Sequence, residues 1–238
     1  MDSQIEALRD LIKGSDNIVF FGGAGVSTES GIPDFRSTSG LYSQKYAYPP
    51  ETMLSHSFFM DNAEEFYRFY RDKMVHLGAK PNAAHLKLAE LESEGKLKAV
   101  VTQNIDNLHQ MAGSRCVYEL HGSVHRNFCM KCGSPFPVER IMESSGVPRC
   151  GCGGIIKPDV VLYEEPLNQD VLEGAVLAIG DADVLIVGGT SLNVYPAAGL
   201  LRYYQGGKLI LINKSELPHE RNAVLAIRGS IGEMLGQV

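Results

Sequence analysis

The stretch FFGGAGVSTESGIPDFR, residues 20–36, joins the end of an apolar run to a glycine-rich turn. A strand that ends in closely spaced glycines is typical of the first turn of a dinucleotide-binding α/β fold, where the backbone approaches a phosphate. The dehydrogenase fingerprint also requires G-x-G-x-x-G spacing and an acidic residue about 20 positions further on. Here the glycines are displaced, and a Pro-Asp-Phe-Arg run follows at once. The segment alone leaves two interpretations open, a nucleotide site and a tight strand-to-helix turn.

Short apolar runs alternate with helical patterns along the chain. The runs are apolar on both faces, as buried parallel strands are. They lie at residues 17–21, 98–102, 183–187 and 208–212. Helical patterns lie between them, at residues 82–94, 168–179 and 196–204. Asn82 and Asn168 are expected N-caps. The alternation predicts a doubly wound α/β fold with a parallel sheet.

Size and charge exclude several classes of protein. A chain of 238 residues, 44% hydrophobic and 21% charged, predicts one large globular domain or one large and one small. The net charge of −6 argues against binding to nucleic acid. The first 14 residues lack the apolar core of a secretion signal, and no apolar run reaches the ~18 residues that span a bilayer. We therefore expect a cytoplasmic protein that does not enter membranes.

Four of the five cysteines form two close pairs. Cys129 and Cys132 are followed, after 17 residues, by Cys150 and Cys152. Two knuckles at this separation are the ribbon pattern of tetrahedral zinc, although the second pair is C-x-C rather than C-x-x-C. Two buried thiol pairs or a redox dithiol are the alternatives. Four thiolates would close the coordination sphere, so the predicted zinc is structural. Cys116 stands alone and is expected to be a buried, inert thiol.

Polar residues follow two of the predicted strands. The segment TQNIDNLHQ, residues 102–110, lies at the carboxyl end of a buried run, which is where open α/β sheets bind ligands. Asn104 and Asp106 would present an amide and a carboxylate there, or the segment would be a helix start capped by Asp106 or Asn107. Asn213 follows the run KLILI and is either a ribose-binding residue or a turn residue.

His121, in the segment YELHGSV, is one of seven histidines. A lone histidine is most often structural or on the surface. Its ordinary pKa of about 6.5 also suits a general base near neutral pH. The adjoining Gly122 and the position just before the cysteine pairs favour the catalytic interpretation.

Six motifs occur in the order in which they occur in the sirtuins, and the resemblance covers nearly the whole chain. The motifs are GAGVSTESGIPDFR, TQNIDNLHQ, ELHGSV, the two cysteine pairs, GGTSLNVYPAA and LILIN. The resemblance implies an NAD-dependent protein-lysine deacetylase of the bacterial single-domain type, expected to be a monomer. It implies a Rossmann-like NAD-binding domain from residues 1–36, 78–115 and 157–238. A cofactor-binding loop and helical module at 37–77 and a zinc-binding module at 116–156 would complete the fold.

The resemblance also implies the site residues. The general base would be His121, with Asn104 as a second catalytic residue. The substrate strand would contain Val161, Tyr163 and Glu164, and Cys129, Cys132, Cys150 and Cys152 would bind zinc. The residues in contact with NAD would be Ala24, Thr28, Phe35, Arg36, Gln103, Asn104, Ile105, Asp106, His121, Thr190, Ser191, Asn213 and Ile231. In the reaction, the carbonyl oxygen of acetyl-lysine displaces nicotinamide from NAD, and free lysine and acetyl-ADP-ribose are formed.

Two departures from the family bear on the substrate. Sirtuins that remove succinyl or malonyl groups have a Tyr followed three positions later by an Arg, but here Tyr67 is followed by Tyr70, so neutral acyl groups are expected. The family's Phe-Gly-Glu is Tyr163-Glu164-Glu165 in this chain, which leaves the affinity for peptide open. A mono-ADP-ribosyltransferase on the same scaffold, or a non-catalytic NAD-sensing module, is the alternative function.

Overall fold

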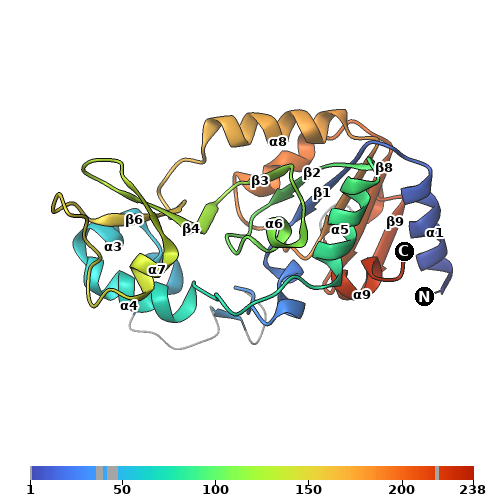
Figure 1. The fold of residues 1–238 in the computed structure, drawn as a ribbon. Coiled ribbons are helices and arrows are strands. Elements are labelled where there is room, and N and C mark those ends of the chain that lie inside the picture. The colour runs from blue at the N-terminus through green and yellow to red at the C-terminus, as the bar shows by residue number, and fades with distance from the viewer. Residues whose placement is uncertain (1, 36–39, 42–47, 218–219) are drawn as a thin grey trace.

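The computed structural model describes residues 2–35, 40–41, 48–217 and 220–238. Figure 1 shows a large parallel sheet with helices on both faces, and a smaller part at the other end of the molecule that contains α3, α4, α7, β4 and β6. Both termini lie beside the large sheet, next to α1 (Asp2–Lys13). In the described part of the chain, no helix is long and apolar enough to cross a membrane.

The large sheet has six strands in the order β3-β2-β1-β7-β8-β9, and every neighbouring pair is parallel. Their bounds are Val117–Glu119 for β3, Leu97–Thr102 for β2, Ile18–Gly22 for β1, Val184–Gly188 for β7, Lys208–Asn213 for β8 and Leu225–Arg228 for β9. The four strands expected from the apolar runs are confirmed to within one residue. The central strands β1 and β7 are buried along their whole length, which explains why they are apolar on both faces.

Alternate residues of the central strand β1 support two separate cores. Ile18 and Phe20 pack with α1, α5 (Ala83–Ser93) and α9 (Ile231–Leu235). Val19 and Phe21 pack on the opposite face with α8 (Gln169–Asp181) and the 3₁₀ helix η4 (Ala197–Tyr203). The doubly wound arrangement predicted from the sequence is therefore present.

The two predicted helix N-caps are present, but one of the predicted helices is of a different type. The side chain of Asn82 accepts a hydrogen bond from Ala84 N, and that of Asn168 accepts one from Val171 N, so both predicted N-caps are confirmed. The α-helix expected at 196–204 is instead the 3₁₀ helix η4. Gly199 lies in its middle, and glycine lowers the stability of an α-helical segment.

The small part combines an antiparallel sheet with four helices. The sheet has the order β5 (Pro135–Pro137), β4 (Gly122–Cys129), β6 (Ile156–Val160). The helices are α2 (Pro50–Met53), α3 (His56–Asp61), α4 (Ala63–Lys73) and α7 (Val138–Met142). One hydrophobic cluster joins them, in which Phe59, Phe66 and Tyr70 of the helices pack with Val124 and Ile156 of the sheet.

Two strands at the ends of the 116–156 segment pair in different sheets. β3, at residues 117–119, is an edge strand of the large sheet, and β6 extends to residue 160 within the small sheet. The chain therefore passes between the two parts near residues 120–122 and again near 160–162. Gly122 adopts φ 76°, and a Cβ atom there would lie 1.9 Å from the carbonyl oxygen of Asp159, so the crossing requires glycine.

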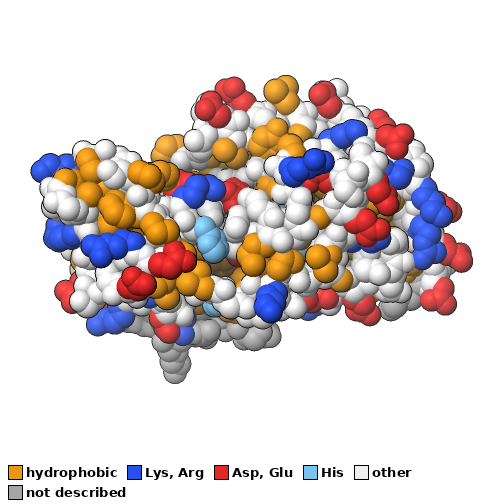
Figure 2. Space-filling model, viewed as in Figure 1, with side chains coloured by type: hydrophobic (Ala, Val, Ile, Leu, Met, Phe, Trp, Pro, Cys, Tyr) orange, Lys and Arg blue, Asp and Glu red, His pale blue; other side chains and the backbone are white. Residues whose placement is uncertain are grey.

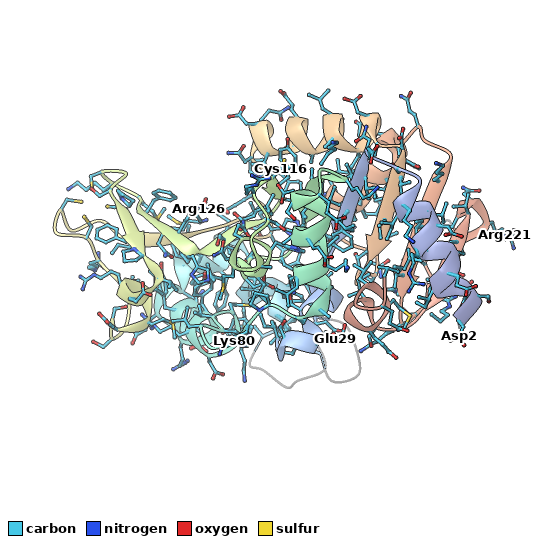
Figure 3. All side chains as sticks on the ribbon, turned by 45° about the vertical axis from the view of Figure 1, so that its right-hand side comes forward. Asp2, Glu29, Lys80, Cys116, Arg126 and Arg221 are labelled. Carbon is cyan, nitrogen blue, oxygen red and sulfur yellow. The ribbon has the colours of Figure 1, made fainter. Side chains whose placement is uncertain are left out.

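Arg126 joins the two sheets beside this crossing (Figure 3). Its Nη1 lies 2.6 Å from Oε2 of Glu119 on β3, and its Nε donates to Oδ2 of Asp159 on β6 at 2.8 Å. Val124, two residues before it, donates from its backbone N to the carbonyl oxygen of Ile105 at 3.0 Å. The middle of β4, where its pairing register shifts, is thus bonded to the large part through Val124 and through Arg126.

Candidate functional site

The residues predicted to bind ligands meet at one edge of the large sheet. They follow β1, β2, β3, β7 and β8, and the carboxyl ends of parallel strands lie together. Two cavities open there, which we call the sheet-edge cavity, of about 500 Å³, and the cleft cavity, of about 240 Å³. Six residues line both, namely Ala24, Phe35, Gln103, Asn104, His121 and Val194. Figure 2 shows acidic and histidine side chains where the two parts of the molecule meet.

Backbone forms part of the floor of the sheet-edge cavity. After β1 the chain enters the 3₁₀ helices η1 (Ala24–Val26) and η2 (Thr28–Ser30), and Gly25 N donates to the carbonyl oxygen of Gly189 at 2.7 Å. A Cβ on Gly25 would lie 2.8 Å from the backbone of Gly189. The two turns that follow β1 and β7 therefore approach each other as closely as backbones can, and a ligand can lie directly against them.

Hydroxyl and amide groups form the walls of the sheet-edge cavity. The Oγ1 of Thr190 accepts from Nε2 of Gln103 at 3.1 Å and from Leu192 N at 3.2 Å. Asn213, at the end of β8, donates to the carbonyl oxygen of Ser215 at 3.0 Å. Lys214 adds a positive charge. Asp34 also lines this cavity. Neutral donors and acceptors beside a cation suit a ligand that combines sugar hydroxyls with phosphates.

Ser27 connects two residues of the TQNIDNLHQ segment. Its Oγ donates to Oδ2 of Asp106 at 2.6 Å and accepts from Nδ2 of Asn104 at 3.0 Å. Ser27 is 1% exposed and Asn104 8%, so the three side chains are held rigidly. Oδ1 of Asp106 also accepts from Leu108 N at 3.0 Å, where helix α6 (Leu108–Ala112) begins. The sequence left open whether Asp106 belongs to a polar pocket or caps a helix. Its carboxylate does both, since one oxygen bonds Ser27 and the other accepts from the start of α6.

Sequence reasoning missed Ser27. A serine after a glycine-rich turn has many ordinary uses, and nothing in the local sequence indicates that it meets a segment almost 80 positions further on.

His121 follows β3, where the chain leaves the large sheet. Its Nδ1 lies 2.9 Å from the carbonyl oxygen of Gln103, and because a carbonyl only accepts, Nδ1 carries the proton of this bond. Burial lowers the pKa of His121, with a smaller opposing effect of the Gln103 carbonyl. The imidazole is therefore neutral at neutral pH and has a free lone pair on Nε2. This is the state a general base requires.

The cleft cavity lies between the two parts of the molecule and is lined mainly by apolar side chains, including Ile32, Leu54 and Met74. The predicted substrate residues Val161, Tyr163 and Glu164 also line it. Val161 N donates to the carbonyl oxygen of His121 at 3.0 Å, so this segment is attached directly to the candidate base.

The four paired cysteines come together as a candidate metal centre. All four sulfur atoms lie within 4.8 Å of one another. Sγ of Cys129 is 3.5 Å from that of Cys152, and Sγ of Cys132 is 3.7 Å from that of Cys150. A disulfide would require about 2.05 Å. Zinc–sulfur bonds of about 2.3 Å give tetrahedral edges of about 3.8 Å, so the arrangement fits zinc.

The remaining predicted residues divide between the two cavities. The sheet-edge cavity is lined by Ala24, Thr28, Phe35, Gln103, Asn104, His121, Thr190, Ser191, Asn213 and Ile231. Ile105 and Asp106 line the cleft cavity. Arg36 lies outside the described residues. Cys116, expected to be buried, is only half-buried, because it lies at the edge of the sheet just before β3. The roles of all these residues stay predictions.

Comparison with known proteins gives consistent matches along the chain. A family model described as "Sir2 family" matches residues 23–196. A protein of Clostridium perfringens named NAD-dependent protein deacetylase is 60% identical, with 100% of this chain and 99% of that protein covered. The protein of the same name from Clostridium acetobutylicum is 59% identical, with 99% and 98% covered.

Solved structures agree with the sequence matches. A Sir2 variant in complex with a deacetylated p53 peptide and 3′-O-acetyl-ADP-ribose superposes with a TM-score of 0.91 at 42% identity, covering 99% of this chain and 97% of that one. A Sir2 complex with a p53 peptide and NAD⁺ gives 0.84 at 42% identity, with 97% and 95% covered. A Sir2 structure with a propionylated peptide gives 0.85 at 40% identity, with 98% and 95% covered.

Proposed function

The chain belongs to the Sir2 family, the sirtuins, and we propose that its two adjoining cavities hold NAD and an acetyl-lysine side chain on either side of His121. The protein is an NAD-dependent protein deacetylase. The observation that carries the assignment of the site is the shared wall of the two cavities. Asn104 and His121 both belong to it, so the two substrates would meet at these side chains.

NAD would occupy the sheet-edge cavity and supply the ribose carbon from which nicotinamide leaves. The backbones of Gly25 and Gly189 leave room for phosphates, while Thr190, Ser191 and Asn213 offer hydrogen bonds to ribose hydroxyls. Phe35, Asn104 and Asp106 would enclose the nicotinamide end. This arrangement lowers the barrier mainly by orienting the two reactants and by excluding water.

His121 would remove a proton from a ribose hydroxyl. The carbonyl of Gln103 fixes the Nδ1–H tautomer, so Nε2 is the atom that accepts the proton. Asn104, held by Ser27, would donate its remaining amide hydrogen to the reacting groups. Both side chains are ready before the substrates bind.

The four cysteines have no catalytic duty in this proposal. A zinc ion with four thiolate ligands has no open position for water, so it would stabilise the small part and nothing more. We also propose the division into the NAD-binding domain, the helical module and the zinc module expected from the sequence.

The partner we propose is an acetylated-lysine segment of another protein. Acetylated and propionylated peptides in the related structures support this. We further propose a cytoplasmic monomer that binds neither membranes nor nucleic acid, and the net charge of −6 argues against the latter. Light scattering after size exclusion, which reports the mass of the particle, tests the monomer directly.

One incubation tests the function. The protein, NAD and an acetyl-lysine peptide are combined, and every product is weighed by mass spectrometry. We expect loss of the acetyl group from the peptide together with equal amounts of nicotinamide and acetyl-ADP-ribose. A peptide that gains ADP-ribose instead would show a mono-ADP-ribosyltransferase. Binding of NAD without any product would show a sensor.

His121→Ala is the decisive variant. We expect it still to bind NAD, within a few-fold of the wild-type affinity, and to lose deacetylation by about 100-fold or more. Full activity in this variant would overturn the assignment of the base.

A further inference from the structure

Glu164 occupies a backbone conformation that glutamate rarely adopts. Its φ is 76°, in the left-handed region, where a Cβ atom crowds the backbone. The other described non-glycine residues with positive φ are Asn107 and Leu192. Asparagine tolerates this region, but a long unbranched acid has no intrinsic reason to be there. A strained residue that lines a substrate cavity calls for a compensating contact.

The carboxylate of Glu164 provides that contact. Its Oε2 accepts from Ser57 N at 2.8 Å and from Ser57 Oγ at 2.5 Å. Ser57 lies in the first turn of α3, whose amides have no partner within the helix. These two hydrogen bonds lower the pKa of Glu164, so the side chain is charged at neutral pH. An ionised acceptor makes both bonds stronger than neutral ones.

Backbone contacts attach the same loop to the start of α3. Tyr163 N donates to the carbonyl oxygen of Leu54 at 3.0 Å, and His56 N donates to that of Tyr163 at 2.9 Å. Glu165 adds contacts to Nδ1 of His56 at 2.8 Å and to Nζ of Lys157 at 3.0 Å. The loop of residues 161–165 is thus fixed at three successive positions, and Glu164 is the one whose backbone is strained.

We propose that Glu164 is a positioning residue for the peptide: its bonds to Ser57 hold the 161–165 loop in the left-handed turn, in the shape that a bound acetyl-lysine segment requires. The inference rests on the proposed function, because it takes this loop as a wall of the peptide site. The loop begins one residue after β6 and is bonded to His121 through Val161, so its shape also sets the distance from the peptide to the base. A loop ordered in advance avoids the entropy cost of ordering on binding.

Three single variants separate the contact from the strain. Glu164→Gln keeps the shape and removes the charge, and Ser57→Ala removes one of the two donors. We expect both to raise the KM for an acetyl-lysine peptide about three- to tenfold, because a charge-assisted hydrogen bond is lost. Both should change kcat less than twofold and leave the KM for NAD unchanged. Glu164→Gly removes the contact together with the strain that the contact offsets, so it should keep the KM for the peptide within about twofold of the wild type.

A double-mutant cycle and a control complete the kinetic test. The effect of Ser57→Ala should be smaller when Glu164 is already Gln, because the two residues act through one contact and Gln accepts a weaker hydrogen bond. Glu6→Gln, on the exposed face of α1, removes the same charge far from the cleft and should leave every constant unchanged. If Glu164→Gln binds peptide as well as the wild type, or the two single effects add, the inference is wrong.

Hydrogen exchange tests the loop without any turnover. The amide hydrogens of Tyr163 and Glu165 should exchange faster in Ser57→Ala and in Glu164→Gln than in the wild type, while those of β1 stay protected. Unchanged exchange at these two amides would overturn the inference even if the enzyme is active. Failure of the wild type to deacetylate any peptide would instead count against the proposed function, and the exchange result would still decide whether Glu164 holds the loop.

Discussion

Arg126 neutralises a buried carboxylate across the junction of the two sheets: its Nη1 lies 2.6 Å from Oε2 of Glu119, whose side chain is only 8% exposed. We expect Arg126→Met to lower the free energy of unfolding by about 2 kcal/mol, because Glu119 would keep its charge without a partner. The expected loss of stability is moderate because the guanidinium is 47% exposed, so water screens part of its interaction with Glu119. Urea denaturation followed by circular dichroism measures it.

The double variant Glu119→Gln with Arg126→Met is the matched control. It removes both charges, so most of the lost stability should return. A single Arg126→Met variant as stable as the wild type would mean that the bridge contributes nothing across the junction.

The environment of His121 predicts the acid side of the pH profile. Burial lowers its pKa from the ordinary value of about 6.5, so the neutral base persists to lower pH than an exposed histidine would. The acid limb of kcat/KM for the peptide should have its midpoint below pH 6.5. A midpoint above pH 7 would contradict the buried, neutral imidazole.

Two buried histidines behind the site predict acid sensitivity of the fold. His85 and His109 are 0% and 1% exposed, and their ring centroids are 4.7 Å apart. Burial lowers the pKa of His85 to about 4 and that of His109 to about 3. The folded state therefore binds fewer protons than the unfolded state between pH 6.5 and about 4. Stability is complete above pH 6.5 and decreases as the pH falls, by up to about 1.4 kcal/mol per pH unit for each histidine.

His109→Phe tests this acid sensitivity, since it keeps a ring in the core and removes one titrating group. Urea denaturation at several pH values between 7.5 and 5 should give a shallower decrease for the variant than for the wild type. Equal slopes would show that His109 does not titrate in this range.

Removal of zinc should affect the small part first. We expect Cys129→Ser and Cys132→Ser to lose the bound metal and to unfold residues 122–160 at a lower temperature than the wild type, because metal binding supplies folding free energy. Cys116→Ser is the matched control, since this thiol is far from the cluster in sequence and is not among its ligands. Metal content and melting curves measured together check the prediction, and equal melting with and without chelator would refute it.

The acyl preference follows from where the helix α4 places its side chains. Arg71 donates from Nε to the carbonyl oxygen of Ile141 at 2.8 Å and from Nη2 to Ser144 Oγ at 2.8 Å, so its charge is used within the small part. Tyr67 donates its hydroxyl to the carbonyl oxygen of Ile156. Neither residue lines the cleft cavity. Lys73, the α4 cation that does line it, is paired with Asp72 at 2.9 Å. We expect kcat/KM for an acetylated peptide to exceed that for the succinylated one at least tenfold, and comparable values would contradict this.

The sequence predicted the strands best where burial is greatest. The runs that form β1, β2, β7 and β8 are apolar on both faces. A short run of this kind is typical of a strand buried inside a parallel sheet. The edge strand β3 has three residues, two of them half-buried, and β9 has four, of which one is buried, so neither carries a pattern that stands out. Such short strands exist because a neighbouring strand supplies their hydrogen bonds, and that information is not local.

In the candidate site, too, the features set by local sequence were predicted and those that depend on distant residues were not. The cysteine spacing predicted a cluster because the ligand geometry of zinc constrains spacing directly. The environment of Glu164 could not be predicted, since it depends on Ser57, which lies more than 100 positions earlier in the chain. The substitution of a family glycine was visible in the sequence, but the hydrogen bonds that compensate for it were visible only in the fold.

The contact of Gly25 with Gly189 limits how this enzyme can change over evolution. Where the backbones of Gly25 and Gly189 meet, any side chain added to Gly25 would separate the two turns. The sheet-edge cavity, which we propose for NAD, is therefore constrained at this point, while the cleft cavity, whose walls are side chains and a loop bonded to α3, can diverge toward new protein targets. The two cavities thus differ in how freely their walls can change, and the 2.7 Å hydrogen bond between Gly25 and Gly189 marks the constrained one.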